Sequence, residues 1–191
     1  IARSYLLEAN RGAILLSRSS TLVVMDATIS MDHLMNSAKH TVTTMFARAS
    51  EVLEAHNIPV DVFKMQFAVY RNYNSIADKI LQYSAWESRP QMLQGFLNGI
   101  EVDGGWQNEA IEIGLFHAAN EAEANRCTQV ILIGDAANNS DEEVVFKRAH
   151  KGESYWRTTP FSTPTTLQQQ LDRLKNCNVP IQAFLDRKSV V

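Results

Sequence analysis

Cysteine is scarce in this chain, whose 191 residues include only Cys127 and Cys177. Two cysteines cannot build the disulfide framework of a small secreted domain, and they cannot supply a four-sulfur zinc site. Long apolar runs are also missing, because no stretch approaches the roughly 20 apolar residues that a transmembrane helix needs. We therefore expect a soluble chain with no membrane partner.

An excess of positive charge is absent as well. The chain has 18 Lys and Arg against 21 Asp and Glu, which gives a formal net charge of -3. Nucleic-acid-binding domains usually present a basic surface to the phosphate backbone, so we expect no nucleic-acid partner. The sequence also lacks a phosphate-binding loop, a Gly-x-Ser-x-Gly motif and a dinucleotide fingerprint. These absences favour a protein that is not an enzyme.

What the sequence does contain is an alternation of short apolar runs with amphipathic stretches. Residues 21–26 (TLVVMD) place apolar side chains next to one another, which is typical of a strand covered on both faces. Residues 31–53 then carry apolar side chains at helical spacing, and Ser30 is expected to cap this helix. Similar patterns predict further strands at 60–70, 79–84, 129–134 and 179–185. They predict further helices near 92–100, 110–119, 141–148 and 167–174.

Strands that alternate with helices indicate an α/β fold. We predict a Rossmann-like, doubly wound, mainly parallel sheet with helices on both faces, in which residues 79–84 form one antiparallel edge strand. Residues 19–191 are expected to form one domain, preceded by an N-terminal helical extension at residues 1–18. Asp141 is expected to cap its helix, and Glu112 and Glu121 to lie on a solvated helix face.

Two of the most apolar predicted strands end in aspartate, at Asp26 and Asp135. Ligands of doubly wound sheets bind at the carboxyl ends of the strands, so both carboxylates stand where a site is expected. Each aspartate also has a simpler interpretation, in which it caps the next helix. Thr28 and Ser30 alternate with Asp26, and carboxylate and hydroxyl oxygens together suit Mg²⁺ or Mn²⁺.

The spacing Asp26-x-Thr28-x-Ser30 resembles the Asp-x-Ser-x-Ser motif of the von Willebrand factor A (vWA) domain family. Residues 70–74 (YRNYN) and 103–110 (DGGWQNEA) resemble segments of an intracellular-type branch, which includes the domain attached to some alpha-kinases. In that branch the second segment ends in Pro-Glu-Ala. Residues 131–136 (ILIGDA) resemble its Leu-Ile-Gly-Asp-Ala-Pro segment, whose aspartate belongs to the metal site. The resemblance extends over residues 19–186.

The resemblance implies a protein-binding module of a larger, intracellular and cytoplasmic protein. It implies that Asp26, Ser30 and Asp135 hold Mg²⁺ or Mn²⁺, with Thr28 bound directly or through water. An acidic side chain of a protein partner would complete the coordination of the cation. Such a site is a metal-ion-dependent adhesion site.

The loop at residues 106–108 departs from the family pattern. The branch commonly has an aspartate there and the wider family a threonine, whereas this chain has Trp106, Gln107 and Asn108. Gln107 or Asn108 can offer a carbonyl oxygen, but a neutral amide is a weaker ligand for a hard cation. A vWA-like scaffold with a degenerate, metal-free site, which binds through aromatic loops, therefore stays open as an alternative.

Aromatic residues also accompany the predicted binding face. Trp106 lies beside the expected metal loop, and Tyr155, Trp156 and Arg157 occupy a long connection after Asp135. These residue types dominate protein-interface hot spots, so all four are candidate partner contacts. The alternative is that the aromatics of the connection fold back over the sheet edge or a helix.

A third functional interpretation treats Asp26 as the nucleophile of a phosphohydrolase. Enzymes of the haloacid-dehalogenase type also have an aspartate after an apolar strand. They need a second aspartate two positions later, where this chain has Thr28, and a later lysine with paired acids, which the sequence does not reveal. We therefore rank this reading below both binding modules.

Overall fold

The computed structural model describes residues 19–185 of the chain. The predicted N-terminal extension at residues 1–18 lies outside the described residues. Within residues 19–185, no helix combines the length and the apolar composition that crossing a bilayer requires.

The sheet has five strands in the order β3-β2-β1-β4-β5. Their bounds are β1 Ser19–Asp26, β2 Phe63–Tyr70, β3 Leu81–Tyr83, β4 Gln129–Gly134 and β5 Ile181–Leu185. All neighbouring pairs are parallel except β2 and β3, which are antiparallel. The predicted mainly parallel sheet with one antiparallel edge strand is therefore confirmed.

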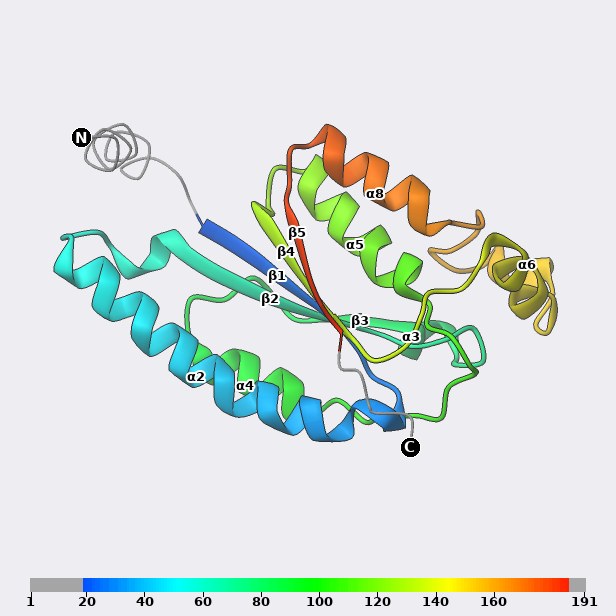
Figure 1. Cartoon of the computed structure of the whole chain (residues 1–191), viewed down its shortest axis with the longest axis horizontal. Helices are drawn as coiled ribbons and strands as arrows, with labels where there is room; N and C mark the ends of the chain where they lie inside the picture. Colours follow the sequence, from blue (N-terminus) through cyan, green and yellow to red (C-terminus); the bar gives the residue numbers. More distant parts are fainter. Residues whose placement is uncertain (1–18, 186–191) are drawn as a thin grey trace.

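Helices cover both faces of this sheet (Figure 1). The helices α2 (Asp32–Ala55) and α4 (Pro90–Asn98) lie on one face. The helices α5 (Ile111–Glu123) and α8 (Leu167–Asn176) lie on the other, and α6 (Asp141–Ala149) contributes to the same core as α5. Short helical turns complete the chain: η1 Ile29–Met31, η2 Val60–Val62, α3 Ala77–Ile80 and α7 Glu153–Trp156. The fold is thus the expected α/β arrangement.

Strand β1 is buried on both faces because it lies in the centre of the sheet. Leu22 and Val24 join the core under α5, whereas Val23 and Met25 join the core under α2. A strand with helices on both sides cannot alternate apolar with polar residues, which explains its uninterrupted apolar run. Helix α5 approaches the sheet closely at Gly114, where a Cβ atom would stand 2.5 Å from Val24 Cγ1.

Several predicted element boundaries were wrong. Ser30 does not cap α2, because a 3₁₀ turn over Ile29–Met31 intervenes and Met31 occupies the N-cap position. Ser140 caps α6 in place of Asp141, because Ser140 accepts a hydrogen bond from the Glu143 N–H in a reciprocal capping box. Residues 60–62 form a 3₁₀ turn before β2 begins, which shortens the predicted strand.

Glu112 and Glu121 were predicted on a solvated face of α5, and this prediction was wrong. Their exposed fractions are 0% and 7%, because α5 is packed between the sheet and α8. Glu112 accepts hydrogen bonds from Tyr73 Oη (2.9 Å) and Asn139 Nδ2 (3.2 Å). Glu121 is paired with Arg126 at 2.7 Å. Glu121 is therefore compensated by its ion pair, whereas only Oε1 of Glu112 has hydrogen-bonding partners and its Oε2 is buried without one.

Candidate metal and binding site

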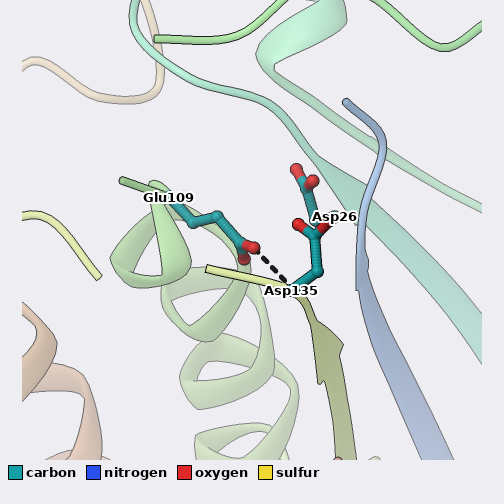
Figure 2. Close-up of side chains that lie close together, drawn as sticks. All are labelled: Asp26, Glu109 and Asp135. Carbon is teal, nitrogen blue, oxygen red and sulfur yellow. Dashed lines mark hydrogen bonds between the residues drawn. The ribbon is translucent and has the colours of Figure 1, made fainter. Parts of the chain in front are cut away.

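Three carboxylates converge at the carboxyl edge of the sheet. Asp26 ends β1 and Asp135 follows β4, and these two strands are neighbours. Glu109, from the loop that precedes α5, points at both (Figure 2). One oxygen from each of the three residues lies within 4.8 Å of the others. Parallel neighbours carry both strand ends to the same edge, which is the placement that the sequence predicted for Asp26 and Asp135.

A chain of hydroxyl groups joins the two aspartates. Thr28 Oγ1 donates to Asp26 Oδ2, and it lies 2.9 Å from Ser30 Oγ. Ser30 Oγ in turn donates to Asp135 Oδ1 at 3.1 Å. The four carboxylate and hydroxyl residues among the six predicted metal ligands are thus brought together, with Asp26 buried and Ser30 exposed. The loop after β1 is held in place by a backbone hydrogen bond from Ile29 N to Asp103 O at 3.1 Å.

Glu109 links this site to the loop after β4. Its Oε1 accepts hydrogen bonds from the backbone N–H groups of Asp135 (2.8 Å) and Ala136 (2.7 Å). Its Oε2 accepts a hydrogen bond from Tyr70 Oη at 2.5 Å. The carboxylate lies so close to the end of β4 that a Cβ atom at Gly134 would stand 2.6 Å from Glu109 Oε2. Glycine at position 134 therefore makes room for Glu109.

Burial and the charges of neighbouring acids raise the pKa values of Asp26 and Glu109. The pKa of Asp26 rises to about 6, mainly because the carboxyl group is buried, and the charge of Asp135 adds to the shift. The pKa of Glu109 rises to about 7, again mainly through burial, with a contribution from the charge of Asp26. Groups with like charge that share a site disfavour full ionisation. A divalent cation would remove this repulsion.

The loop at residues 104–108 is held by three side chains, two from the loop after β2 and one from α6. Asn74 Nδ2 donates to Gly104 O at 2.7 Å, and Asn72 Nδ2 donates to Asn108 O at 2.5 Å. The buried Lys147 of α6 donates to Gln107 O at 2.6 Å. The main-chain path of this loop is therefore fixed although the loop belongs to no helix or strand.

The predicted amide ligands differ in their surroundings. Asn108 Nδ2 donates to both oxygens of Glu143, at 2.9 and 3.0 Å, and the residue adopts a φ of 63°. The Gln107 side chain is exposed. Both residues, with Trp106, line a depression of about 570 Å³ that also contains Thr28 and Asp135. Residues 106–108 contribute no carboxylate, and the acid of this loop that lies with Asp26 and Asp135 is Glu109.

Trp156 was predicted to contact a partner, and the structure contradicts this. Its exposed fraction is 0%, and its Nε1 donates to Arg148 O at 2.9 Å inside the core beneath α6. Tyr155 is half-buried, and its hydroxyl accepts a hydrogen bond from Ala77 N at 2.8 Å. Arg157 is exposed. The aromatics of this connection therefore fold back, as the alternative interpretation proposed, because an indole of this size is more stable in the core than in water.

Glu109 is the site residue that the sequence interpretation missed. A ligand was expected at residues 106–108, and the acid immediately after them was not predicted as part of the site. Two signals were present: Glu109 is the only ionisable residue between positions 104 and 110, and it matches the glutamate of the Pro-Glu-Ala segment.

No protein-family model matches the sequence, and no curated protein matches it. Among solved structures, the chain is similar to two crystal structures of the pilus adhesin SpaC from Lactobacillus rhamnosus GG. Sequence identities are 15% and 14% over 62% and 63% of this chain, with TM-scores of 0.47 and 0.48. It is also similar to three N-terminal domains of the type V pili tip protein Mfa5 from Porphyromonas gingivalis, at 14% identity over 62% of this chain and a TM-score of 0.40. The chain spans 14%, 16% and 20% of the lengths of these three chains.

Proposed function

We propose that this chain is a vWA-like protein-binding module of a larger protein, whose partner docks at the carboxyl edge of the sheet through a divalent cation. Asp26, Ser30 and Asp135 hold Mg²⁺ or Mn²⁺, and Thr28 binds it directly or through water. An acidic side chain of the partner completes the coordination. The observation that carries this proposal is the meeting of three carboxylates within 4.8 Å, two of them joined by hydroxyl groups.

The donor set fits a small hard cation. Mg²⁺ and Mn²⁺ prefer carboxylate and hydroxyl oxygens, and the site residues supply these and no sulfur. The buried Asp26 has a raised pKa, so it gains from a nearby positive charge. Glu109 already accepts three hydrogen bonds, so its role is to add negative charge and to position the Asp135 loop. This arrangement favours the metal-dependent reading over the degenerate, metal-free one.

A catalytic role for Asp26 has less support. The phosphohydrolase reading needs an acid at position 28, and Thr28 there donates its hydroxyl proton to Asp26. Lys147 is the buried lysine nearest to the site loop, but its amine is bound to Gln107 O and Asn139 Oδ1. The proposed function is therefore binding of a partner and not hydrolysis of a phosphorylated substrate.

The test is a calorimetric titration of Mn²⁺ into the chain and into three variants. Asp26→Asn and Asp135→Asn each remove one charged ligand with little change in shape, and Asp172→Asn is the control because Asp172 is exposed on α8. We expect one Mn²⁺ per chain in the wild type and in the control, and at least about tenfold weaker binding in both site variants. Equal Mn²⁺ binding by all four proteins, or none by the wild type, would overturn the proposal.

A further inference from the structure

Three aromatic rings form a connected group that begins at Trp106, which lines the same depression as Asp135 and Glu109. The Trp106 and His150 rings are 4.8 Å apart between centroids, and the Phe146 and His150 rings are 5.2 Å apart. We call Trp106, Phe146 and His150 the aromatic rim. Phe146 has an exposed fraction of 68%, and its neighbour Val145 one of 64%. Phe146 and Val145 therefore present apolar surface to the solvent beside the exposed His150 and the half-buried Trp106.

The geometry of α6 explains why these side chains face outward. Val144, Lys147 and Arg148 point inward and are buried, which fills the side of α6 that packs on the protein. Val145 and Phe146 lie on the opposite, exposed side of α6, where they do not contribute to the core. A single exposed apolar residue on a surface is ordinary, but adjoining exposed apolar residues beside aromatic rings in contact, one pair tilted at 50° and one edge-on at 85°, are typical of an interaction site.

Trp106 connects the rim to the carboxylates. It lines the depression that contains Thr28, Ser30 and Asp135, and its ring also contacts His150, the residue that follows α6. A ligand bound at the metal site could therefore extend over Trp106 toward His150 and Phe146. Trp106 also packs against the core, so it offers a rigid surface.

We propose that the partner presents a short segment with two features: a carboxylate that reaches the cation and, close to it in the sequence, an aromatic or large aliphatic side chain that packs on the aromatic rim. This inference rests on the proposed function, and it adds the chemistry of the partner. Contact between a carboxylate and a metal ion is common to many acidic ligands, whereas the rim selects among them. Buried aromatic contacts of this kind dominate interface energetics.

The charges around the rim define the partner further. The first turn of α6 carries Asp141, Glu142 and Glu143, and the pKa values of both glutamates are lowered by hydrogen bonds. Additional acids in the partner at this position would be repelled. The segment therefore carries its acid at the metal end and apolar or basic residues at the α6 end.

The experiment is a selection of phage-displayed random peptides on the immobilised chain in Mn²⁺, with a parallel selection in EDTA. We expect the peptides enriched only in Mn²⁺ to share an acidic residue and a nearby aromatic or large aliphatic residue. The enriched consensus peptide is then synthesised, and its dissociation constant is measured for the wild-type chain and for variants.

Phe146→Ser is the test variant, and Val52→Ser is its matched control, because Val52 is an exposed apolar residue of α2 with an exposed fraction of 59%. We expect Phe146→Ser to weaken the consensus peptide about tenfold or more while leaving Mn²⁺ binding unchanged. Val52→Ser is expected to change neither. His150→Ala provides a second variant, with the same expected loss.

Two kinds of failure are distinguishable. Consensus peptides that carry an acid but no apolar residue, or that bind Phe146→Ser as tightly as the wild type, overturn the role of the rim and leave the metal site standing. Peptides that lack an acid, or that are enriched equally in EDTA, overturn the proposed function and this inference with it. A selection that enriches no peptide also counts against the inference.

Discussion

Asp26 is a buried acid with two other carboxylates close to it. Its exposed fraction is 1%, and it lies among Asp135, Glu109 and the hydroxyl of Thr28. Burial and the charge of Asp135 raise its pKa to about 6, so at neutral pH its ionised form destabilises the fold. Binding sites often contain residues that weaken the protein in the absence of the ligand.

Asp26→Asn is therefore expected to stabilise the metal-free protein. The amide oxygen still accepts the Thr28 N–H, while the negative charge and its repulsion are removed. We predict that the free energy of unfolding at pH 7.5 in EDTA increases by about 1–2 kcal/mol, measured by urea denaturation. In Mn²⁺ the order should reverse, because only the wild type gains stability from the cation. A variant that is less stable than the wild type in EDTA would contradict this account of Asp26.

Glu112 gives a pH dependence that does not involve the metal ligands. Burial raises its pKa to about 7 from an ordinary value of 4.5, so the folded state binds its proton more tightly than the unfolded state does. The stability that this adds is present below about pH 4.5 and is lost as the pH rises to about 7. His117 opposes the trend, since burial lowers its pKa to about 4.

Glu112→Gln should therefore flatten the fall in stability between pH 5 and pH 7. The glutamine keeps an acceptor for Tyr73 Oη and carries no charge. Each such group contributes a slope of up to about 1.4 kcal/mol per pH unit, which urea denaturation at several pH values can detect. Glu54→Gln is the control, because Glu54 is exposed on α2. An identical slope in wild type and Glu112→Gln would show that Glu112 is not the group responsible.

The site residues that the sequence identified lie at the end of a predicted strand or in the few residues that follow it. Asp26 and Asp135 were predicted because a strand's end fixes where its last side chain lies, whatever the loops do. Glu109 was missed because its position depends on the path of the loop before α5 and on the space at Gly134. Trp156 was misassigned because a loop sequence does not reveal which aromatic turns inward.

At the scale of elements, α6 and the 104–108 loop depend on each other. Lys147 has an exposed fraction of 6%, and it donates to Gln107 O and to Asn139 Oδ1. Burial lowers the pKa of Lys147, and the charges of Glu143 and Glu112 oppose that shift. The loop that carries Trp106 is thus held in place by a hydrogen bond from the charged amine of Lys147 on α6.

Lys147→Met should loosen this loop. The substitution leaves Gln107 O and Asn139 Oδ1 without a donor, and an unpaired buried acceptor costs about 1–3 kcal/mol. We predict a loss of stability of that size in urea denaturation, and faster hydrogen exchange of the peptide that covers residues 104–109. Lys175→Met, on the exposed surface of α8, is the control and should change neither. Unchanged exchange in this peptide would show that Lys147 does not hold the loop.

At the scale of the whole molecule, the strand order produces the site. β1 lies between β2 and β4, so its carboxyl end meets that of β4 and the residues that follow β2. The alternation of buried strands with amphipathic helices was sufficient to predict a mainly parallel sheet covered on both faces, whereas the strand order comes from the structure. Helix starts at residues 30 and 141 were not predictable in the same way, because serine hydroxyls and short 3₁₀ turns compete for the same few backbone N–H groups.

A divalent cation bound among the acids at the carboxyl edge would be located by an anomalous difference map from crystals of the chain grown with Mn²⁺. We expect one strong peak within about 2.2 Å of oxygens from Asp26, Ser30 and Asp135, with Glu109 still bound to the backbone of residues 135 and 136. A map with no peak at these residues, from crystals in which Mn²⁺ is present in excess, would contradict the proposed metal site.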